Sequence, residues 1–146
     1  MEKGGTMIKI LLSILVVNIY LFSASIGSIE KGDLDKFENA FALVTRGSQI
    51  LSVNELGFKI EENDTIKTFR KSTVQIRLND NTIIKIGQKT TLNVEKYLFD
   101  SQNKGNNAAN LKIENGTFQI KTGTIGDDAP KNFKIKTKFS TIGLRG

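Results

Sequence analysis

The sequence predicts an all-β protein, and three observations support this prediction. The region after residue 40 is dense in Val, Ile, Thr and Phe that alternate with Lys, Asn and Gln, a pattern typical of half-buried strands. Polar turns separate these short segments. Helical periodicity is scarce, and Pro130 is the only proline in the 146 residues. Short strands between polar turns indicate a sandwich, a barrel or a short solenoid.

The N-terminal segment has the features of a secretory signal peptide. Lys9 supplies a positive charge, Ile10 to Phe22 form a largely apolar stretch, and the small residues 23–25 follow. We expect signal peptidase to cleave near Ser25 or Gly27. The sequence therefore predicts export of the chain.

An uncleaved anchor in the inner membrane is the alternative. A membrane-spanning helix needs about 20 mostly apolar residues, whereas the stretch here has 13. We therefore favour a periplasmic or secreted protein over an anchored one. The expected organisation is a signal peptide over residues 1–25, a linker over 26–40 and a β-domain over 41–146.

The composition excludes several classes of protein. The chain has no Cys and no His, so it has no disulfide, no lipid-modified Cys, and none of the commonest general bases, thiol nucleophiles or soft metal ligands. The formal net charge is +6. For an exported chain this favours an envelope protein partner or an anionic glycan over nucleic acid. The competing interpretation is a set of solvated, Lys-rich strand faces.

The clearest strand prediction covers Ser72 to Gly87, STVQIRLNDNTIIKIG. Apolar residues of one parity alternate with polar ones, residues 79–81 form a polar turn, and Ile83 to Ile86 continue the hairpin. The residues predicted to face the core are Val74, Ile76 and Leu78.

Three other segments also predict strands. Phe41 to Val53 indicates a hairpin around residues 46–48. Leu111 to Gly123 contains Asn115-Gly116, the type of tight turn that two-residue hairpins prefer. A last strand is expected at Phe133 to Thr137.

The remaining segments are less regular. Residues 100–110 have no apolar side chain larger than Ala and predict a flexible loop. Residues 34–44 are compatible with one short helical turn. The turns at 79–81 and 114–116 recur 35 residues apart, which favours stacked, similar units.

No catalytic, metal or cofactor site is predicted. No spacing of carboxylates marks a glycosidase pair, and no glycine pattern of a phosphate-binding loop is present. Residues 79–81 offer oxygen ligands for Ca²⁺, but they lack the glycine and the distal Glu of a calcium loop, so a hairpin turn is preferred. The acidic residues weighed and interpreted as solvated turn residues are Asp33, Asp35, Glu61, Glu62, Asp64, Asp127 and Asp128.

The segments together resemble a known family. They are, in order, VTRGSQILSV, IEENDTIKTFRKS, STVQIRLNDNTIIKIGQKTTLNV, LKIENGTFQIKTG and FKIKTKFSTIGLRG. This series resembles the FecR domain of bacterial periplasmic signalling and envelope proteins from about Phe41 to Gly146. Its most specific parts are residues 79–82 and 142–146.

The resemblance implies a solenoid-like β-domain, with a β-sandwich as the alternative, that works as a non-catalytic sensing or protein-binding module in signal transduction. Members that regulate sigma factors carry a cytoplasmic segment before a membrane helix. Here nine residues precede the apolar stretch, so direct control of a sigma factor is not expected. Family members continue past the terminal Arg-Gly, so the chain is expected to be a C-terminally truncated fragment.

Partner binding is expected near the terminal strand, by pairing along a strand edge. Arg145 lies between two glycines and is weighed as a structural clamp against a carboxylate-binding group. Lys138 stands where the family usually has Pro. A cell-wall or polysaccharide-binding domain is the alternative function, with Tyr97, Phe99 and Phe118 as aromatic residues that fit the core equally well. The candidate partner-binding residues are Lys136, Lys138 and Arg145.

Overall fold

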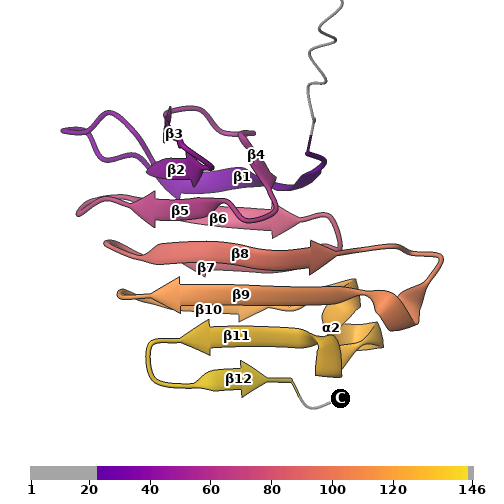
Figure 1. Ribbon diagram of the computed structural model, residues 1–146. Coiled ribbons are helices and arrows are strands. Elements are labelled where there is room, and N and C mark those ends of the chain that lie inside the picture. The colour runs from indigo at the N-terminus through magenta and orange to yellow at the C-terminus, as the bar shows by residue number, and fades with distance from the viewer. Residues whose placement is uncertain (1–22, 145–146) are drawn as a thin grey trace, which may run out of the picture.

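The computed structural model describes residues 23–144 as two β-sheets that face each other (Figure 1). Most of the predicted signal peptide and Arg145 lie outside these residues. The smaller sheet has five strands in the order β10-β7-β6-β1-β4. Its strands are β1 (Ser25–Asp33), β4 (Lys59–Glu61), β6 (Thr73–Leu78), β7 (Ile83–Ile86) and β10 (Phe118–Lys121).

The larger sheet has seven strands in the order β12-β11-β9-β8-β5-β2-β3. Every strand pair in the two sheets is antiparallel except the parallel pair of β9 and β11. The strands are β2 (Ala42–Arg46), β3 (Gln49–Val53), β5 (Thr65–Thr68), β8 (Thr91–Leu98), β9 (Ala108–Glu114), β11 (Phe133–Thr137) and β12 (Thr141–Gly143). The all-β prediction is confirmed, and two facing layers correspond to the sandwich alternative.

The chain passes repeatedly from one sheet to the other. After β5 it crosses to the hairpin β6–β7, returns for the hairpin β8–β9, crosses to β10, and returns through α2 (Thr124–Asp128) to β11. The connections therefore gather at the two ends of the strand stack (Figure 1). No helix among the described residues is long and apolar enough to cross a membrane.

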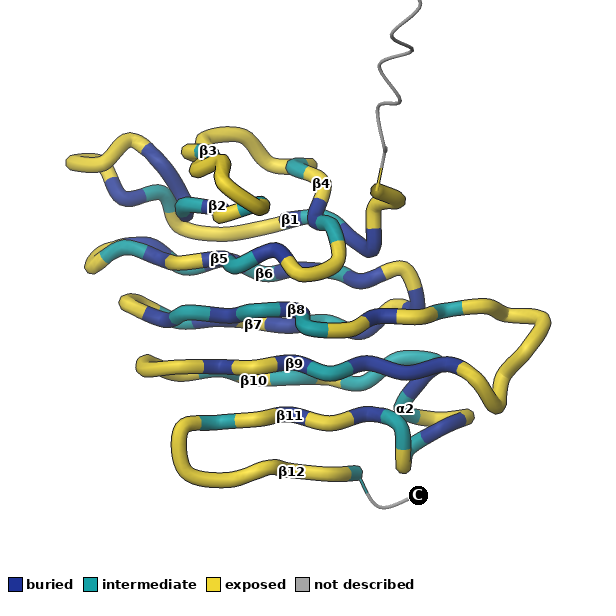
Figure 2. The backbone as a smooth tube through the Cα atoms, viewed as in Figure 1, coloured by how far each residue is buried: buried dark blue, intermediate teal, exposed yellow. Residues whose placement is uncertain are grey.

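The core lies between the sheets and follows the alternation of the sequence. In β6 the three residues predicted to face inward are at most 2% exposed, because side chains of one parity all point to the same side of a strand. Figure 2 shows this alternation of buried and exposed positions along the strands. The largest fully buried side chains include Ile29, Ile60, Ile66, Ile84, Leu92, Leu111, Ile125 and Phe133.

The expectation of a linker over residues 26–40 is wrong. Residues 25–33 form β1, which lies between β4 and β6 in the smaller sheet. Ile26 and Ile29 belong to the core. Gly27 is needed at this position because a Cβ atom would lie 2.4 Å from the carbonyl oxygen of Arg77. The folded unit therefore begins at Ser25 and contains the whole core.

The tight turn at Asn115-Gly116 forms, but it does not join a hairpin. Both residues have positive φ, 57° and 71°, as the sequence predicts. The flanking strands belong to different sheets, since β9 pairs with β8 and β11 while β10 pairs with β7. The turn at 79–81 does join a hairpin, at the opposite end of the stack. The two turns are therefore not equivalent parts of a repeat.

Three other predictions can be compared with the structure. The hairpin around residues 46–48 and the strand at Phe133–Thr137 are confirmed. The predicted loop over 100–110 ends at 107, where β9 begins with two buried alanines. No helical turn forms at 34–44, because the carboxylate of Asp35 accepts hydrogen bonds from the backbone N–H groups of Phe37 and Glu38 and forms a tight turn instead.

Candidate binding surface

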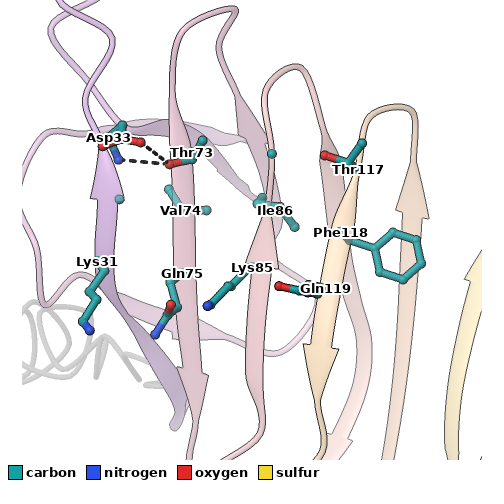
Figure 3. A pocket seen from close by; sticks show the side chains of 12 residues that line it. Lys31, Asp33, Thr73, Val74, Gln75, Lys85, Ile86, Thr117, Phe118 and Gln119 are labelled. Atoms are coloured by element: carbon teal, nitrogen blue, oxygen red, sulfur yellow. Dashed lines mark hydrogen bonds between the residues drawn. The ribbon is translucent and has the colours of Figure 1, made fainter.

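The outer face of the five-stranded sheet carries a row of long polar side chains. Lys31 pairs with Gln75, Gln75 with Lys85, and Lys85 with Gln119 in the register of four neighbouring strands. Gln75, Lys85 and Gln119 alternate with inward-facing residues of their strands, so they point away from the core. An irregularity in β1 gives Lys31 the same orientation. Figure 3 shows the four side chains side by side across the strands. We call this set the Lys–Gln row.

A bulge in β1 helps to build the row. The register of β1 on β6 shifts between Ile29 and Lys31, which leaves Glu30 as the extra residue. Glu30 and Lys31 are then both on the outer face. A regular strand would have turned one of them toward the core.

Two hollows meet at the Lys–Gln row, and both are lined by all four of its residues. The first has a volume of about 680 Å³ and extends toward the rim, where the hydroxyl of Thr73 donates a hydrogen bond of 3.1 Å to Asp33 (Figure 3). The second has a volume of about 540 Å³ and extends toward Arg77 and Lys121. The row is thus the centre of one shallow, elongated surface.

Basic side chains outnumber carboxylates on this surface. Two carboxylates adjoin it: Asp33 lines the rim of the first hollow, and Glu30 lies beside the row. Glu30 is occupied by Arg77, whose Nε lies 2.8 Å from Oε2, and by the side-chain amide of Gln75. The hydrogen bond from Arg77, followed by that from Gln75, holds the pKa of Glu30 below its ordinary value. Within the described residues the other cations of the surface form no ion pair. They are Lys31, Lys85 and Lys121.

The surface suits an extended anionic ligand better than a neutral sugar. Lys31 and Lys85 lie two strands apart, a separation of about 10 Å, with an amide between them. Phe118 is the one aromatic residue that lines the hollows, and it lies opposite buried Ile86 and packs against the core. Its ring is partly buried, so it offers less area for a sugar to stack on than an exposed aromatic residue would.

The three residues predicted for partner binding lie elsewhere. Lys136 is exposed on β11 of the larger sheet, and its Nζ is 3.1 Å from Oε2 of Glu95. Lys138 is in the turn between β11 and β12, with its Nζ 5.9 Å from the centre of the Phe139 ring. Arg145 is outside the described residues. Their role in partner binding stays a prediction.

Three carboxylates interpreted as turn residues or turn ligands are in fact buried. Asp64 accepts two hydrogen bonds from Arg46, at 3.0 and 2.8 Å, and one from the backbone of Glu61 at 2.9 Å. Arg46 also pairs with the side chain of Glu61. These bonds, mainly those to Asp64, raise the pKa of Arg46. The other two are Asp35 and Asp80.

Asp80 joins the turn after β6 to two other elements. One of its oxygens accepts hydrogen bonds from the Tyr97 hydroxyl at 2.8 Å and the Thr82 N–H at 3.2 Å. The other accepts from the Thr82 hydroxyl at 2.8 Å and from the N–H of Ile125 at 3.0 Å. Burial, reinforced by Asp80, raises the pKa of Tyr97. Asp80 is thus a structural acceptor with no free lone pair aimed at a cation.

The Lys–Gln row could be predicted only in part from the sequence. The inward parity of β6 places Gln75 and Arg77 on the outer face. Lys31 lies in a segment that was expected to be a linker, and no local pattern places Gln119 beside Lys85. Within residues 23–144 no group of three or more acidic side chains is placed to hold a metal ion.

Comparison with known proteins gives one match. The family model described as FecR protein matches residues 64–146, from the end of the turn before β5 through the whole second half of the fold. No curated protein and no solved structure matches the chain.

Proposed function

The chain belongs to the FecR protein family, and we propose that it is an exported, non-catalytic sensing module that binds a protein partner in the bacterial envelope. FecR proteins are a family associated with signalling and with the bacterial envelope. A signalling module of this kind needs a surface that recognises its partner.

The observation that supports the proposal most directly is the Lys–Gln row. It offers unpaired ammonium groups and amides at strand spacing on a rigid sheet, with two hollows that meet along it. An extended acidic segment of a partner protein would place its carboxylates against the lysines and its backbone groups against the amides.

The predicted export agrees with the position of the first buried residue, which directly follows one of the two predicted cleavage sites. Ile26 is buried, and its carbonyl accepts a 2.8 Å hydrogen bond from the N–H of Asn79. Cleavage after Ser25 keeps Ile26 in the core, whereas cleavage after Gly27 removes it. We therefore predict that the processed chain begins at Ile26. N-terminal sequencing of the protein from an envelope fraction checks this, and a chain that begins at Ser28 would contradict it.

Photo-crosslinking tests the binding surface. A benzoylphenylalanine at Gln119 should give a discrete protein adduct in cells that produce the chain. Lys85→Glu should reduce the yield of that adduct about tenfold, because it places a negative charge at the centre of the row.

Lys67→Glu is the matched control for that experiment. Lys67 is exposed on β5 of the larger sheet, so the same change in net charge should leave the adduct unchanged. Equal losses in both variants, or no adduct at all, would refute the protein-binding surface. A heterogeneous adduct that resists protease and is degraded by a glycan hydrolase would support the alternative function, binding of an anionic glycan.

A further inference from the structure

Two phenylalanine side chains protrude from the same end of the strand stack. Phe37 is 94% exposed in the connection between β1 and β2, and Phe139 is 91% exposed in the turn between β11 and β12. These connections lie at the same end as those after β5, β7 and β9 (Figure 1). We call this the aromatic end. It comprises residues 34–41, 69–72, 87–90, 115–117 and 138–140.

Exposed cations occupy the same end of the stack as the two rings. Glu38 is the only exposed carboxylate in these five segments. The ammonium group of Lys138 lies over the ring of Phe139, 5.9 Å from its centre. The exposed basic residues of the aromatic end are Lys36, Arg70, Lys71, Lys89 and Lys138.

The opposite end has the reverse charge. It comprises residues 62–64, 79–82, 99–107 and 122–132, and there exposed carboxylates outnumber exposed cations. One of the cations, Lys104, lies near Asp128. The exposed charged residues of this end are Glu62, Asp100, Asp127, Asp128, Lys104 and Lys131. The connecting segments at the two ends therefore differ in charge, with Asp33 and Glu114 adjoining the aromatic end and Lys121 adjoining the opposite end.

The fold holds Phe37 outward. The carboxylate of Asp35 accepts hydrogen bonds from the N–H groups of Phe37 at 2.9 Å and Glu38 at 3.2 Å, and from that of Lys71 at 3.1 Å in the next turn. Burial alone would raise the pKa of Asp35, but these three donors together hold it below its ordinary value. The carboxylate thus stays charged and ties the two turns together.

The turn that carries Phe139 is also hydrogen-bonded. The hydroxyl oxygen of Thr137 accepts from the N–H groups of Phe139 and Ser140, and the N–H of Thr137 donates to the carbonyl of Ser140 at 2.8 Å. Phe37 and Phe139 are therefore presented by two structured turns. Four strand spacings of the larger sheet separate those turns, about 19 Å.

We propose that the aromatic end is a docking surface for an anionic phospholipid bilayer. Apolar rings at exposed tips, with Lys and Arg at the same end, suit the boundary between headgroups and acyl chains. There the rings leave water, and each basic side chain gains about 1 kcal/mol near an anionic surface. Two tips so far apart, with cations between them, suit a continuous charged layer better than a single pocket on a partner protein.

Docking in this way has a consequence for the rest of the molecule. The strands would then run roughly perpendicular to the membrane plane, with the start of β1 and the acidic end directed away from the membrane. The Lys–Gln row lies on the side of the stack, so it stays open to a partner. The inference does not rest on partner binding at that row.

Vesicle binding tests the inference. The chain has no Trp, so Phe37→Trp and Phe139→Trp each introduce a single reporter. With the processed chain, both should show a blue-shifted emission on vesicles with 30 mole per cent phosphatidylglycerol in phosphatidylcholine, and neither should shift on pure phosphatidylcholine. Ile50→Trp is the control, because Ile50 is 69% exposed on β3, away from the aromatic end.

Co-sedimentation with the same vesicles measures the contributions of the side chains. Phe37→Ser and Phe139→Ser should each weaken binding about tenfold, from the loss of one inserted ring. Lys89→Glu should weaken it by a similar factor, whereas Lys104→Glu at the acidic end should not. Lack of binding by the unmodified chain, or equal binding by all variants, would overturn the proposal. So would salt-dependent association of the chain with itself or with polyglutamate but not with vesicles.

Discussion

Replacing Asp80 with alanine is expected to lower the free energy of unfolding by about 4 kcal/mol. The side chain is fully buried and accepts four hydrogen bonds from three different parts of the chain. Alanine would leave the hydroxyl of Tyr97 and the N–H of Ile125 buried without an acceptor. Each buried donor without a partner costs about 1–3 kcal/mol, and few single substitutions remove so many partners at once.

Denaturant unfolding followed by circular dichroism measures this change. Asp127→Ala is the control, since Asp127 is exposed on α2 and its loss should change stability by no more than about 0.5 kcal/mol. Asp80→Asn should also destabilise the fold, because either orientation of the amide turns its NH₂ toward donors. A cycle with Tyr97→Phe should give a coupling of about 1 kcal/mol or more. Similar effects for Asp80 and Asp127 would show that the buried network does not hold the turn.

The strands with strong alternation could be predicted from the sequence, and β1 could not. Val74, Ile76 and Leu78 form an apolar series that nothing else in the segment contradicts. In β1 the glycines at 27 and 32 weaken the pattern and suggest a linker. Those glycines are present because the backbone of β6 lies close to them, and a Cβ at Gly32 would lie 2.3 Å from the carbonyl oxygen of Thr73. A long-range contact explains why glycine stands at these positions, and a local sequence pattern does not reveal such a contact.

The turns also depend on contacts between distant parts of the chain, which the local sequence does not predict. Asn115-Gly116 has the backbone conformation that its residues favour, but the partner of each flanking strand depends on the whole sheet. The burial of the turn aspartates also depends on residues that are distant in the sequence. Asp80 is polar and in a turn, so it is expected at the surface, and only Tyr97 and α2, distant in sequence, bury it.

Only part of the candidate site could be predicted from the sequence, because strand parity is local and strand order is not. Parity along each strand gives the outward positions, so Gln75 and Lys85 could be assigned to a polar face. The order of strands in the sheet brings Lys31 and Gln119 to the ends of the same row, and that order follows from packing of the whole core. The exposed phenylalanines are harder still, because a lone Phe in a polar segment is normally expected to be buried.

The second large effect is expected for Arg46→Ala, which should lower the free energy of unfolding by about 3 kcal/mol. Arg46 is the main charged partner of Asp64, whose side chain is 1% exposed, and it also donates to the carbonyl of Lys59. Without the guanidinium, a buried carboxylate keeps only the N–H of Glu61 as a donor, and the Glu61 carboxylate loses its counter-charge. The estimate is at the low end of the range for buried pairs, because Arg46 itself is partly exposed.

Arg77→Ala provides the matched control, because it removes the same residue type from an ion pair of the same 2.8 Å length. Arg77 is 42% exposed and its partner Glu30 is also accessible to water, so both charges can be solvated when the pair is broken. Its loss should cost no more than about 1 kcal/mol. Thermal and denaturant unfolding of the two variants give their losses of stability, and the difference between these losses measures the effect of burying the carboxylate. Equal losses would mean that burial of Asp64 adds nothing to the pair. A large loss for Arg46→Ala, retained in Arg46→Lys, would assign the effect to the planar two-point contact, since lysine keeps the charge but lacks the second donor.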